Sequence, residues 1–121
     1  MTEAEALEVA GIFAGNALTA FSIYISFTIA YLVAAYYVGK SLTPFQARAV
    51  SGLYLLSSIA PMLAQITHTT VYGSAMAASH IGSATPLSSG LFWNVGLTLL
   101  MCGGIVVSLI FMRQVRHPKK E

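Results

Sequence analysis

The chain has 121 residues, of which 56% are hydrophobic and only 8% are charged, and its mean hydropathy is +0.74. An ordinary soluble domain carries about 25% charged residues, so the composition excludes that class. The net charge of +2 is too small to indicate a nucleic acid partner, and the single cysteine, Cys102, excludes an intrachain disulfide.

Two long stretches without Asp, Glu, Lys or Arg predict where the chain crosses a membrane. The first runs from Val9 to Gly39 and the second from Ala49 to Met112. A helix needs about 20 apolar residues to cross a hydrocarbon core about 30 Å thick, so the first stretch accommodates one span and the second two. We therefore expect an all-α integral membrane protein, a three-helix bundle formed by a single domain over residues 1–121.

The chain begins with an acidic segment in which Thr2 and Glu5 have the spacing of a capping box. We expect a short helix from about Glu3 to Phe13, lying on the outer surface or continuing into the membrane. A cleaved signal peptide needs basic residues before its apolar stretch. Because this segment carries glutamates instead, we expect the N-terminus to be retained.

The first span is expected at about residues 17–39. Small side chains recur along it at helical spacing and form a surface that lets membrane helices approach closely. These side chains belong to Thr19, Ser22, Ser26 and Ala30. Tyr24 and Tyr31 lie on a neighbouring face, and Tyr36 and Tyr37 are typical of interfacial anchors.

The second helix is expected to start at Thr43 and Pro44, since proline in the first helical position loses no hydrogen bond. It continues to about residue 78 and includes a span at about residues 49–74. Steps of three and four residues bring a row of mostly hydrogen-bonding side chains to one side, which we term the polar face. The polar face comprises Ser51, Tyr54, Ser58, Pro61, Gln65, His68 and Tyr72. Pro61 lacks an amide proton and is expected to kink the helix, with a fixed bend favoured over a moving hinge.

Residues 79–90 are typical of a loop, because serine, threonine, glycine and proline dominate and no charge occurs. The third span is expected at about residues 91–112, with Trp93 near the outer interface. Gly96, Gly103 and Gly104 give this helix a slim surface for close contact.

The basic residues lie in two places that three spans bring to the same side of the membrane. They are Lys40, Arg48, Arg113, Arg116, Lys119 and Lys120. Since Lys and Arg mark the cytoplasmic side, we expect the C-terminus inside and the N-terminus outside. The expected location is a bacterial-type inner membrane or a plasma membrane.

Counting residues from the outer ends of the second and third helices gives the depth of each polar group. His68 then lies near the level of Asn94, and Gln65 near that of Thr98. The groups expected to look toward the polar face are Ser22, Ser26, Asn94 and Thr98. The resulting polar cluster would contain Ser22, Gln65, His68, Asn94 and Thr98.

Two interpretations of these polar groups are open. In the first, they hydrogen-bond between helices, within one chain or between chains. In the second, they line a water-filled path in which His68 handles protons, because imidazole changes charge near neutral pH. No Asp, Glu, Lys or Arg accompanies His68 in the spans, which favours the first interpretation.

Signatures of cofactors and enzymes are weak or lacking in the sequence. His68 and His80 could meet on the outer side, but a zinc site needs three or four convergent ligands, and nothing here encloses a haem. The sequence holds no aspartate, no GxSxG, no P-loop and no CxxC. We expect a protein that is not an enzyme and that takes no cofactor, metal, nucleic acid or soluble substrate.

The polar face is longer than two sister helices are expected to cover. A single chain would then leave polar groups against lipid, where unpaired groups are costly. We therefore expect contacts with the lipid bilayer and with itself or another membrane protein, in a structural or accessory subunit of a homo-oligomer or larger membrane complex. The alternative is a homo-oligomeric channel or transporter whose pathway is lined by Ser51, Ser58, Gln65 and His68.

Overall fold

Residues 2–79 and 90–119 of a computed structural model are described. They form three helices, α1 (Glu3–Val38), α2 (Pro44–Ala78) and α3 (Gly90–Arg116), and this part of the chain contains no strand. The predicted all-α class with three helices is confirmed. Most of the predicted loop at residues 79–90, including His80, lies outside the described residues.

Helix α1 begins with the predicted capping box. The hydroxyl of Thr2 accepts from the amide of Glu5 at 3.2 Å, and the Glu5 carboxylate accepts from the amide of Thr2 at 2.6 Å. Interaction with Thr2 lowers the pKa of the Glu5 carboxyl from its ordinary value. The hydrogen bond from the Thr2 amide has the larger effect, and the Thr2 side chain has the smaller one. The helix then continues unbroken to Val38, so the expected N-terminal helix is the first part of one long helix.

Helix α2 begins as predicted, with Thr43 as its cap and Pro44 in its first turn. A second capping box forms, because the Thr43 hydroxyl accepts from the Gln46 amide at 3.2 Å and the Gln46 side chain accepts from the Thr43 amide at 2.9 Å. The helix passes through the buried Pro61 without interruption. The kink at Pro61 stays a prediction.

Each of the three helices is long and apolar enough to span a membrane. They contain 36, 35 and 27 residues, which corresponds to roughly 54, 52 and 40 Å. All three exceed a hydrocarbon core of about 30 Å. The predicted spans at residues 17–39, 49–74 and 91–112 therefore lie almost entirely within longer helices.

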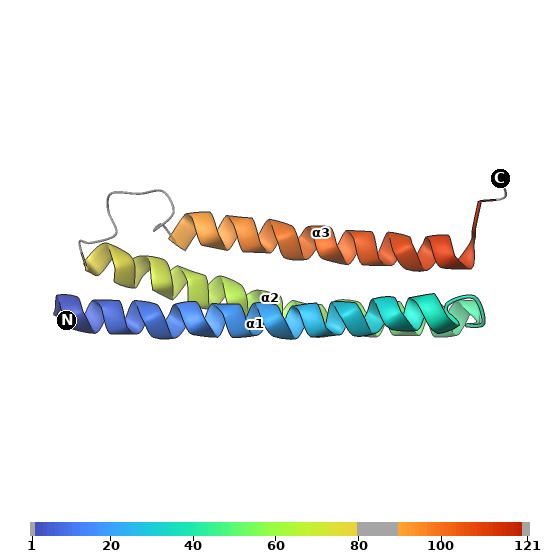
Figure 1. Ribbon diagram of the computed structural model, residues 1–121, viewed down its shortest axis with the longest axis horizontal. Coiled ribbons are helices and arrows are strands. Elements are labelled where there is room, and N and C mark those ends of the chain that lie inside the picture. The colour runs from blue at the N-terminus through green and yellow to red at the C-terminus, as the bar shows by residue number, and fades with distance from the viewer. Residues whose placement is uncertain (1, 80–89, 120–121) are drawn as a thin grey trace.

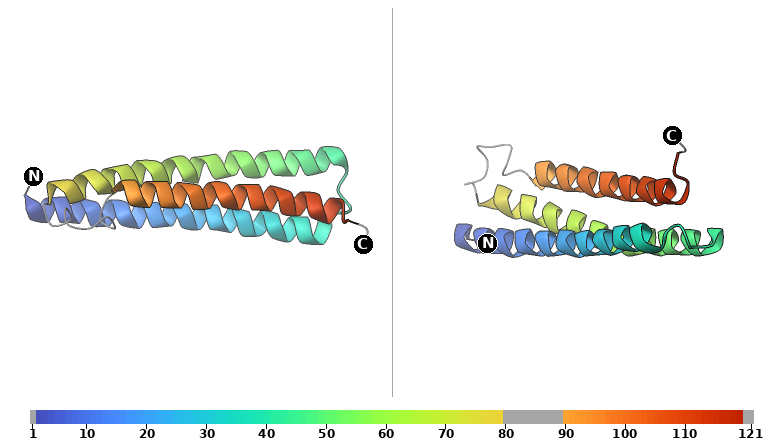
Figure 2. Two further views of the ribbon diagram at one scale, coloured as in Figure 1. Left: turned by 90° about the horizontal axis from the view of Figure 1, so that it is seen from above. Right: turned by 45° about the vertical axis from the view of Figure 1, so that its right-hand side comes forward.

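The three helices lie alongside one another, and every pair is in contact. The contact between α1 and α2 is the most extensive. Viewed from above, α3 lies over the line between α1 and α2 (Figure 2). The C-terminal part of α2 is inclined away from α1 and toward α3 (Figure 1).

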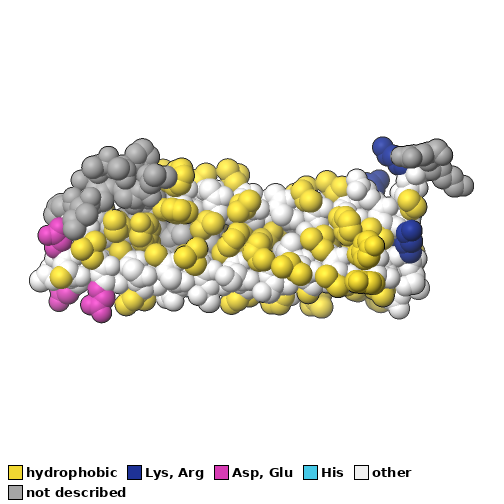
Figure 3. All heavy atoms as spheres, in the orientation of Figure 1, with side chains coloured by type: hydrophobic (Ala, Val, Ile, Leu, Met, Phe, Trp, Pro, Cys, Tyr) yellow, Lys and Arg dark blue, Asp and Glu magenta, His cyan; other side chains and the backbone are white. Residues whose placement is uncertain are grey.

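Charged side chains occupy the two ends of this arrangement (Figure 3). The acidic end carries Glu3, Glu5 and Glu8. The basic end carries Lys40, Arg48, Arg113, Arg116 and Lys119. Hydrophobic side chains cover much of the surface between the two ends (Figure 3).

The face of α1 that packs against the other helices differs from the one expected. It is formed by Ala6, Ala10, Ala17, Ala20, Tyr24, Tyr31 and Ala35. Thr19, Ser22, Ser26 and Ala30 are all exposed. The reason is that the hydroxyls of Ser22 and Ser26 donate to carbonyls one turn back on α1, both at 2.9 Å, and need no partner helix.

Candidate functional site

The polar face of α2 is turned into the chain over most of its length. Tyr54, Ser58, Pro61 and Gln65 are buried, and Ser58 and Gln65 have 0% exposure. Ser51, His68 and Tyr72 are partly buried. Contrary to expectation, the two sister helices cover the central part of this face, because α1 and α3 supply rings and polar groups that reach it, while its two ends stay partly exposed.

Toward the basic end, the polar face meets tyrosines of α1. The ring of Tyr31 stacks on that of Tyr54, with centroids 4.3 Å apart and planes 10° from parallel. The Tyr31 hydroxyl lies 2.8 Å from Ser51 Oγ. The Tyr54 hydroxyl lies 3.0 Å from Thr28 Oγ1 of α1 and 3.5 Å from Ser108 Oγ of α3. One phenol thus reaches both neighbouring helices.

Tyr24 connects α1 to α3 in the same region. Its hydroxyl donates to the carbonyl of Met101 at 2.8 Å. A methyl group added at Gly104 would collide with that hydroxyl, so this glycine leaves the space that the phenol occupies. We term Tyr24, Tyr31 and Tyr54 the tyrosine cluster. In the sequence, Tyr24 and Tyr31 lie seven residues apart and so share one face of a helix. Because a buried tyrosine hydroxyl needs a hydrogen-bond partner, this pair could have indicated the cluster.

Toward the acidic end, amide side chains connect α2 to α3. The Thr98 hydroxyl donates to Gln65 Oε1 at 3.3 Å, and Gln65 Nε2 donates to Thr69 Oγ1 at 3.3 Å. Asn94 Nδ2 donates to Thr70 Oγ1 at 3.1 Å and to a backbone carbonyl of α2 at 3.3 Å. We term Gln65, Thr69, Thr70, Asn94 and Thr98 the amide network.

The amide network differs in membership from the cluster expected from depth. Gln65 and Thr98 are bonded, and Asn94 lies beside them, with Oδ1 3.5 Å from the Thr98 hydroxyl. Ser22 and Ser26 are exposed on α1 and take no part. Thr69 and Thr70, which the polar face omitted, take part instead. Successive residues of a helix are rotated by about 100° about its axis. Two residues at nearly the same depth in the membrane can therefore face different neighbouring helices.

His68 lies on the side of α2 that meets α1. Its ring centroid is 5.5 Å from that of Phe13, so it does not join Asn94. Its Nδ1 atom is buried and makes no hydrogen bond within the described structure. In the same residues no group of three or more His, Cys, Asp or Glu side chains could hold a metal ion.

Glycine sets the closest approach of α2 and α3. A Cβ built at Gly73 would lie 2.7 Å from Gly90 Cα, and one built at Gly90 would lie 2.7 Å from the carbonyl oxygen of Thr69. Real Cβ atoms do not come this close, so only glycine fits both positions. Two of the glycines predicted to make close contacts, Gly96 and Gly103, have no atom within 4 Å of an added Cβ.

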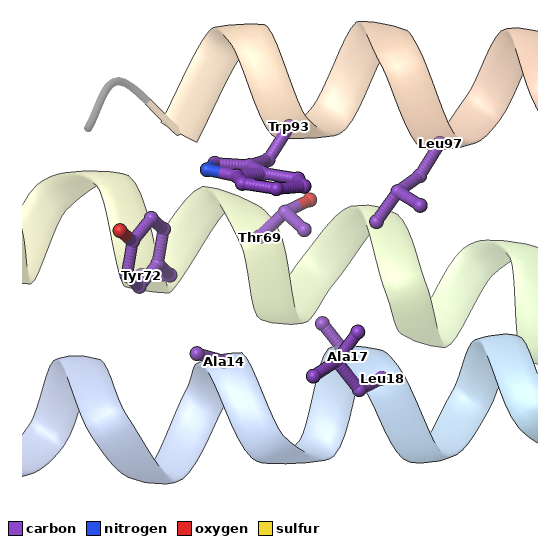
Figure 4. Close-up of a pocket in the computed structure, with 7 residues that line it drawn as sticks. All are labelled: Ala14, Ala17, Leu18, Thr69, Tyr72, Trp93 and Leu97. Carbon is purple, nitrogen blue, oxygen red and sulfur yellow. The ribbon is translucent and has the colours of Figure 1, made fainter. Parts of the chain in front are cut away.

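A pocket of about 160 Å³ lies between the three helices beside the amide network. Its lining consists of Ala14, Ala17, Leu18, Thr69, Tyr72, Trp93 and Leu97. The indole of Trp93 extends from α3 over Thr69, and Leu97 points into the space between the helices (Figure 4). The mainly apolar lining suits a small apolar group rather than a charged one.

At the basic end, Arg116 joins the end of α3 to the connection between α1 and α2. Its Nη1 donates to the carbonyl of Leu42 at 2.8 Å and lies 3.5 Å from the carbonyls of Gly39 and Thr43. In the sequence, Arg116 is one of several basic residues near the C-terminus, and nothing there indicates this contact.

Within residues 2–79 and 90–119, these features define an all-helical fold of three helices that are each long and apolar enough to cross a bilayer, with most of their buried polar groups paired inside the chain. Comparisons of the chain with protein-family models, curated proteins and solved structures find no match.

Proposed function

We propose that this chain is a non-enzymatic subunit of a membrane assembly, with a structural or accessory role that it performs through helix contacts. The assembly is a homo-oligomer or a larger complex in an inner or plasma membrane. The N-terminus lies outside and the C-terminus in the cytoplasm. Support for this orientation comes from the basic end, because Lys and Arg concentrate on the cytoplasmic side of membrane proteins.

The observation that carries the proposal is a row of small residues on the outward side of α1, which we term the α1 stripe. It comprises Gly11, Gly15, Thr19, Ser22, Ser26 and Ala30, all of them exposed. No atom lies within 4 Å of a Cβ built at Gly11 or Gly15. Small residues three or four apart let a second helix approach to van der Waals contact with the backbone. Lipid does not require such a surface, whereas another helix does.

The channel alternative has less support. Its pathway needs water beside the polar face, but Ser58 and Gln65 have no exposed surface, and Ser51 is paired with Tyr31. Water could reach Ser58 and Gln65 only if the helices that cover them separated. A pH-dependent conductance in liposomes that is lost with His68→Ala would favour the channel over the subunit.

The test is the native mass and composition of the full-length protein, extracted gently from its own membrane. We expect an assembly, and we expect Gly15→Leu to release single chains whose helical content and melting temperature are unchanged. The matched control is Gly96→Leu, since Gly96 is also exposed and has open space around it on α3.

A single-chain mass for the unsubstituted protein would contradict the proposal. An assembly that survives both Gly15→Leu and Ser22→Leu would show that α1 does not form the contact. The composition separates the two forms of the proposal, because one kind of chain indicates a homo-oligomer and several kinds indicate an accessory subunit.

A further inference from the structure

The basic end carries positive charges that the described chain does not neutralise. They belong to Lys40, Arg48, Arg113, Arg116 and Lys119. After residue 8 the sequence has one acidic side chain, that of Glu121, against six Lys and Arg side chains. The described glutamates lie at the other end of α1, which is roughly 54 Å long, about five times the screening length of roughly 10 Å in dilute salt. These cations therefore need anions from outside the described chain.

Three of these side chains are free to bind such an anion. Lys40, Arg48 and Arg113 are exposed and make no hydrogen bond or ion pair with the described residues. Arg116 is held differently, because it donates to the carbonyl of Leu42 at 2.8 Å. A carbonyl carries no net charge, so Arg116 adds its positive charge to the same end.

Exposed aromatic rings indicate the depth of this end in a bilayer. Tyr36, Tyr37 and Phe45 are 67%, 77% and 79% exposed. Tyrosine rings are stable at the boundary between hydrocarbon and headgroups, because they are apolar with a polar tip. Arg48 follows Phe45 by three residues in α2, about 4.5 Å along the axis. Its guanidinium therefore reaches the headgroup layer by extending along the helix surface.

The anion available at that depth is the lipid phosphate. A guanidinium binds phosphate oxygens through two parallel N–H bonds, which makes arginine well suited to this group. A zwitterionic headgroup brings a cation along with its phosphate, whereas an acidic phospholipid brings a net negative charge. We propose that the basic end binds acidic phospholipids and so enriches them around the protein. This proposal does not depend on whether the chain joins an assembly.

The test uses full-length protein in vesicles of equal parts phosphatidylcholine and phosphatidylglycerol. After mild extraction, mass spectrometry measures the ratio of the two lipids that stay bound. We expect several-fold more phosphatidylglycerol, since each basic residue near an acidic membrane surface contributes on the order of a fivefold preference. Arg48→Gln combined with Arg113→Gln should remove most of the excess.

The matched control is Glu3→Gln combined with Glu8→Gln, which changes the same number of charges at the acidic end and should leave the lipid ratio unchanged. Should the double arginine variant not fold, Lys40→Gln with Lys119→Gln replaces it, because both lysines are exposed. Equal retention of the two lipids by the unsubstituted protein overturns the proposal. An excess that survives the basic substitutions also overturns it.

A further arm separates lipid from free phosphate. Inorganic phosphate is added at the concentration of the lipid before extraction. Displacement of the bound phosphatidylglycerol would show a site for soluble anions and overturn the assignment to lipid, whereas an unchanged ratio supports it. The mass of the assembly does not enter this measurement, so its outcome is separate from that of the proposed function.

Discussion

The two halves of the chain hold their helices together in different ways. Toward the basic end, the tyrosine cluster fills the space between the helices and carries hydroxyl groups across it. Toward the acidic end, the amide network uses shorter side chains, and it lies beside a pocket and a contact between glycines. A polar group on a large ring supplies both a hydrogen bond and packing. A polar group on a short side chain supplies the bond and leaves space unfilled.

Removing the Tyr54 ring should have the largest effect on this comparison. Tyr54→Ala opens a cavity between all three helices, and truncation of a core aromatic costs about 3–5 kcal/mol. Tyr54→Phe keeps the ring and should cost about 1 kcal/mol, the value of a typical hydrogen bond. Denaturant unfolding in detergent micelles measures both. Equal losses for the two variants would mean that the hydroxyl, not the ring, holds this half together.

Adding a methyl group at Gly73 should cause the second-largest loss of stability. Gly73→Ala forces α2 and α3 apart at their closest point, and overpacking of this kind costs about 1–3 kcal/mol. Gly52→Ala is the control on the same helix, because no atom lies within 4 Å of its added Cβ. Alanine favours a helix over glycine by up to about 1 kcal/mol, so the control should be neutral or stabilising. A stable Gly73→Ala protein would show that the acidic half can widen freely.

Loss of the Gln65 amide should have a smaller effect. Gln65→Leu leaves the Thr98 hydroxyl without this acceptor, and hydrogen bonds between membrane helices average about 0.6 kcal/mol, with values up to about 1.7. Ser26→Ala is the control, since Ser26 bonds only its own helix. Thermal melting in detergent compares the two. A stabilising Gln65→Leu would indicate that the amide network aligns the helices without strengthening their contact.

Filling the pocket should give the smallest change. Ala14→Leu places apolar carbon among the lining residues and should stabilise the protein by about 0.5 kcal/mol, the lower end of the gain from cavity-filling substitutions. Ala60→Leu is the control, because Ala60 is exposed on α2 and lines no part of the pocket. Melting temperatures in detergent measure both variants. A loss of stability with Ala14→Leu would mean that the acidic half is already as tightly packed as the basic half.

The parts of the fold that depend on local chemistry could be predicted from the sequence. Thr2 with Glu5 and Thr43 with Pro44 mark helix starts through neighbouring residues alone. The number of helices follows from the lengths of the uncharged stretches. The depth of a side chain in the membrane could also be predicted, by counting residues from the outer end of its helix. Gln65 and Thr98 are placed at the same level in this way, and they are hydrogen-bonded.

The rotation of each helix about its axis could not be predicted in the same way. On α1, the serine side and the tyrosine side both have helical spacing, and composition alone favours the small residues for close contact. Ser22 satisfies its hydroxyl on its own helix and so carries no information about its neighbours. Tyr24 cannot do this, and its bond to Met101 shows which side is buried. Buried phenols are therefore the better guide to rotation in this chain.

The contact between Arg116 and Leu42 joins residues 74 positions apart. A ribosome delivers α1 and α2 first, so the carbonyl of Leu42 meets water or headgroups until the last turn of α3 has been synthesised. This contact therefore cannot form before residue 116 has been synthesised. A chain that ended before residue 116 would lack the guanidinium that joins α3 to the connection between α1 and α2.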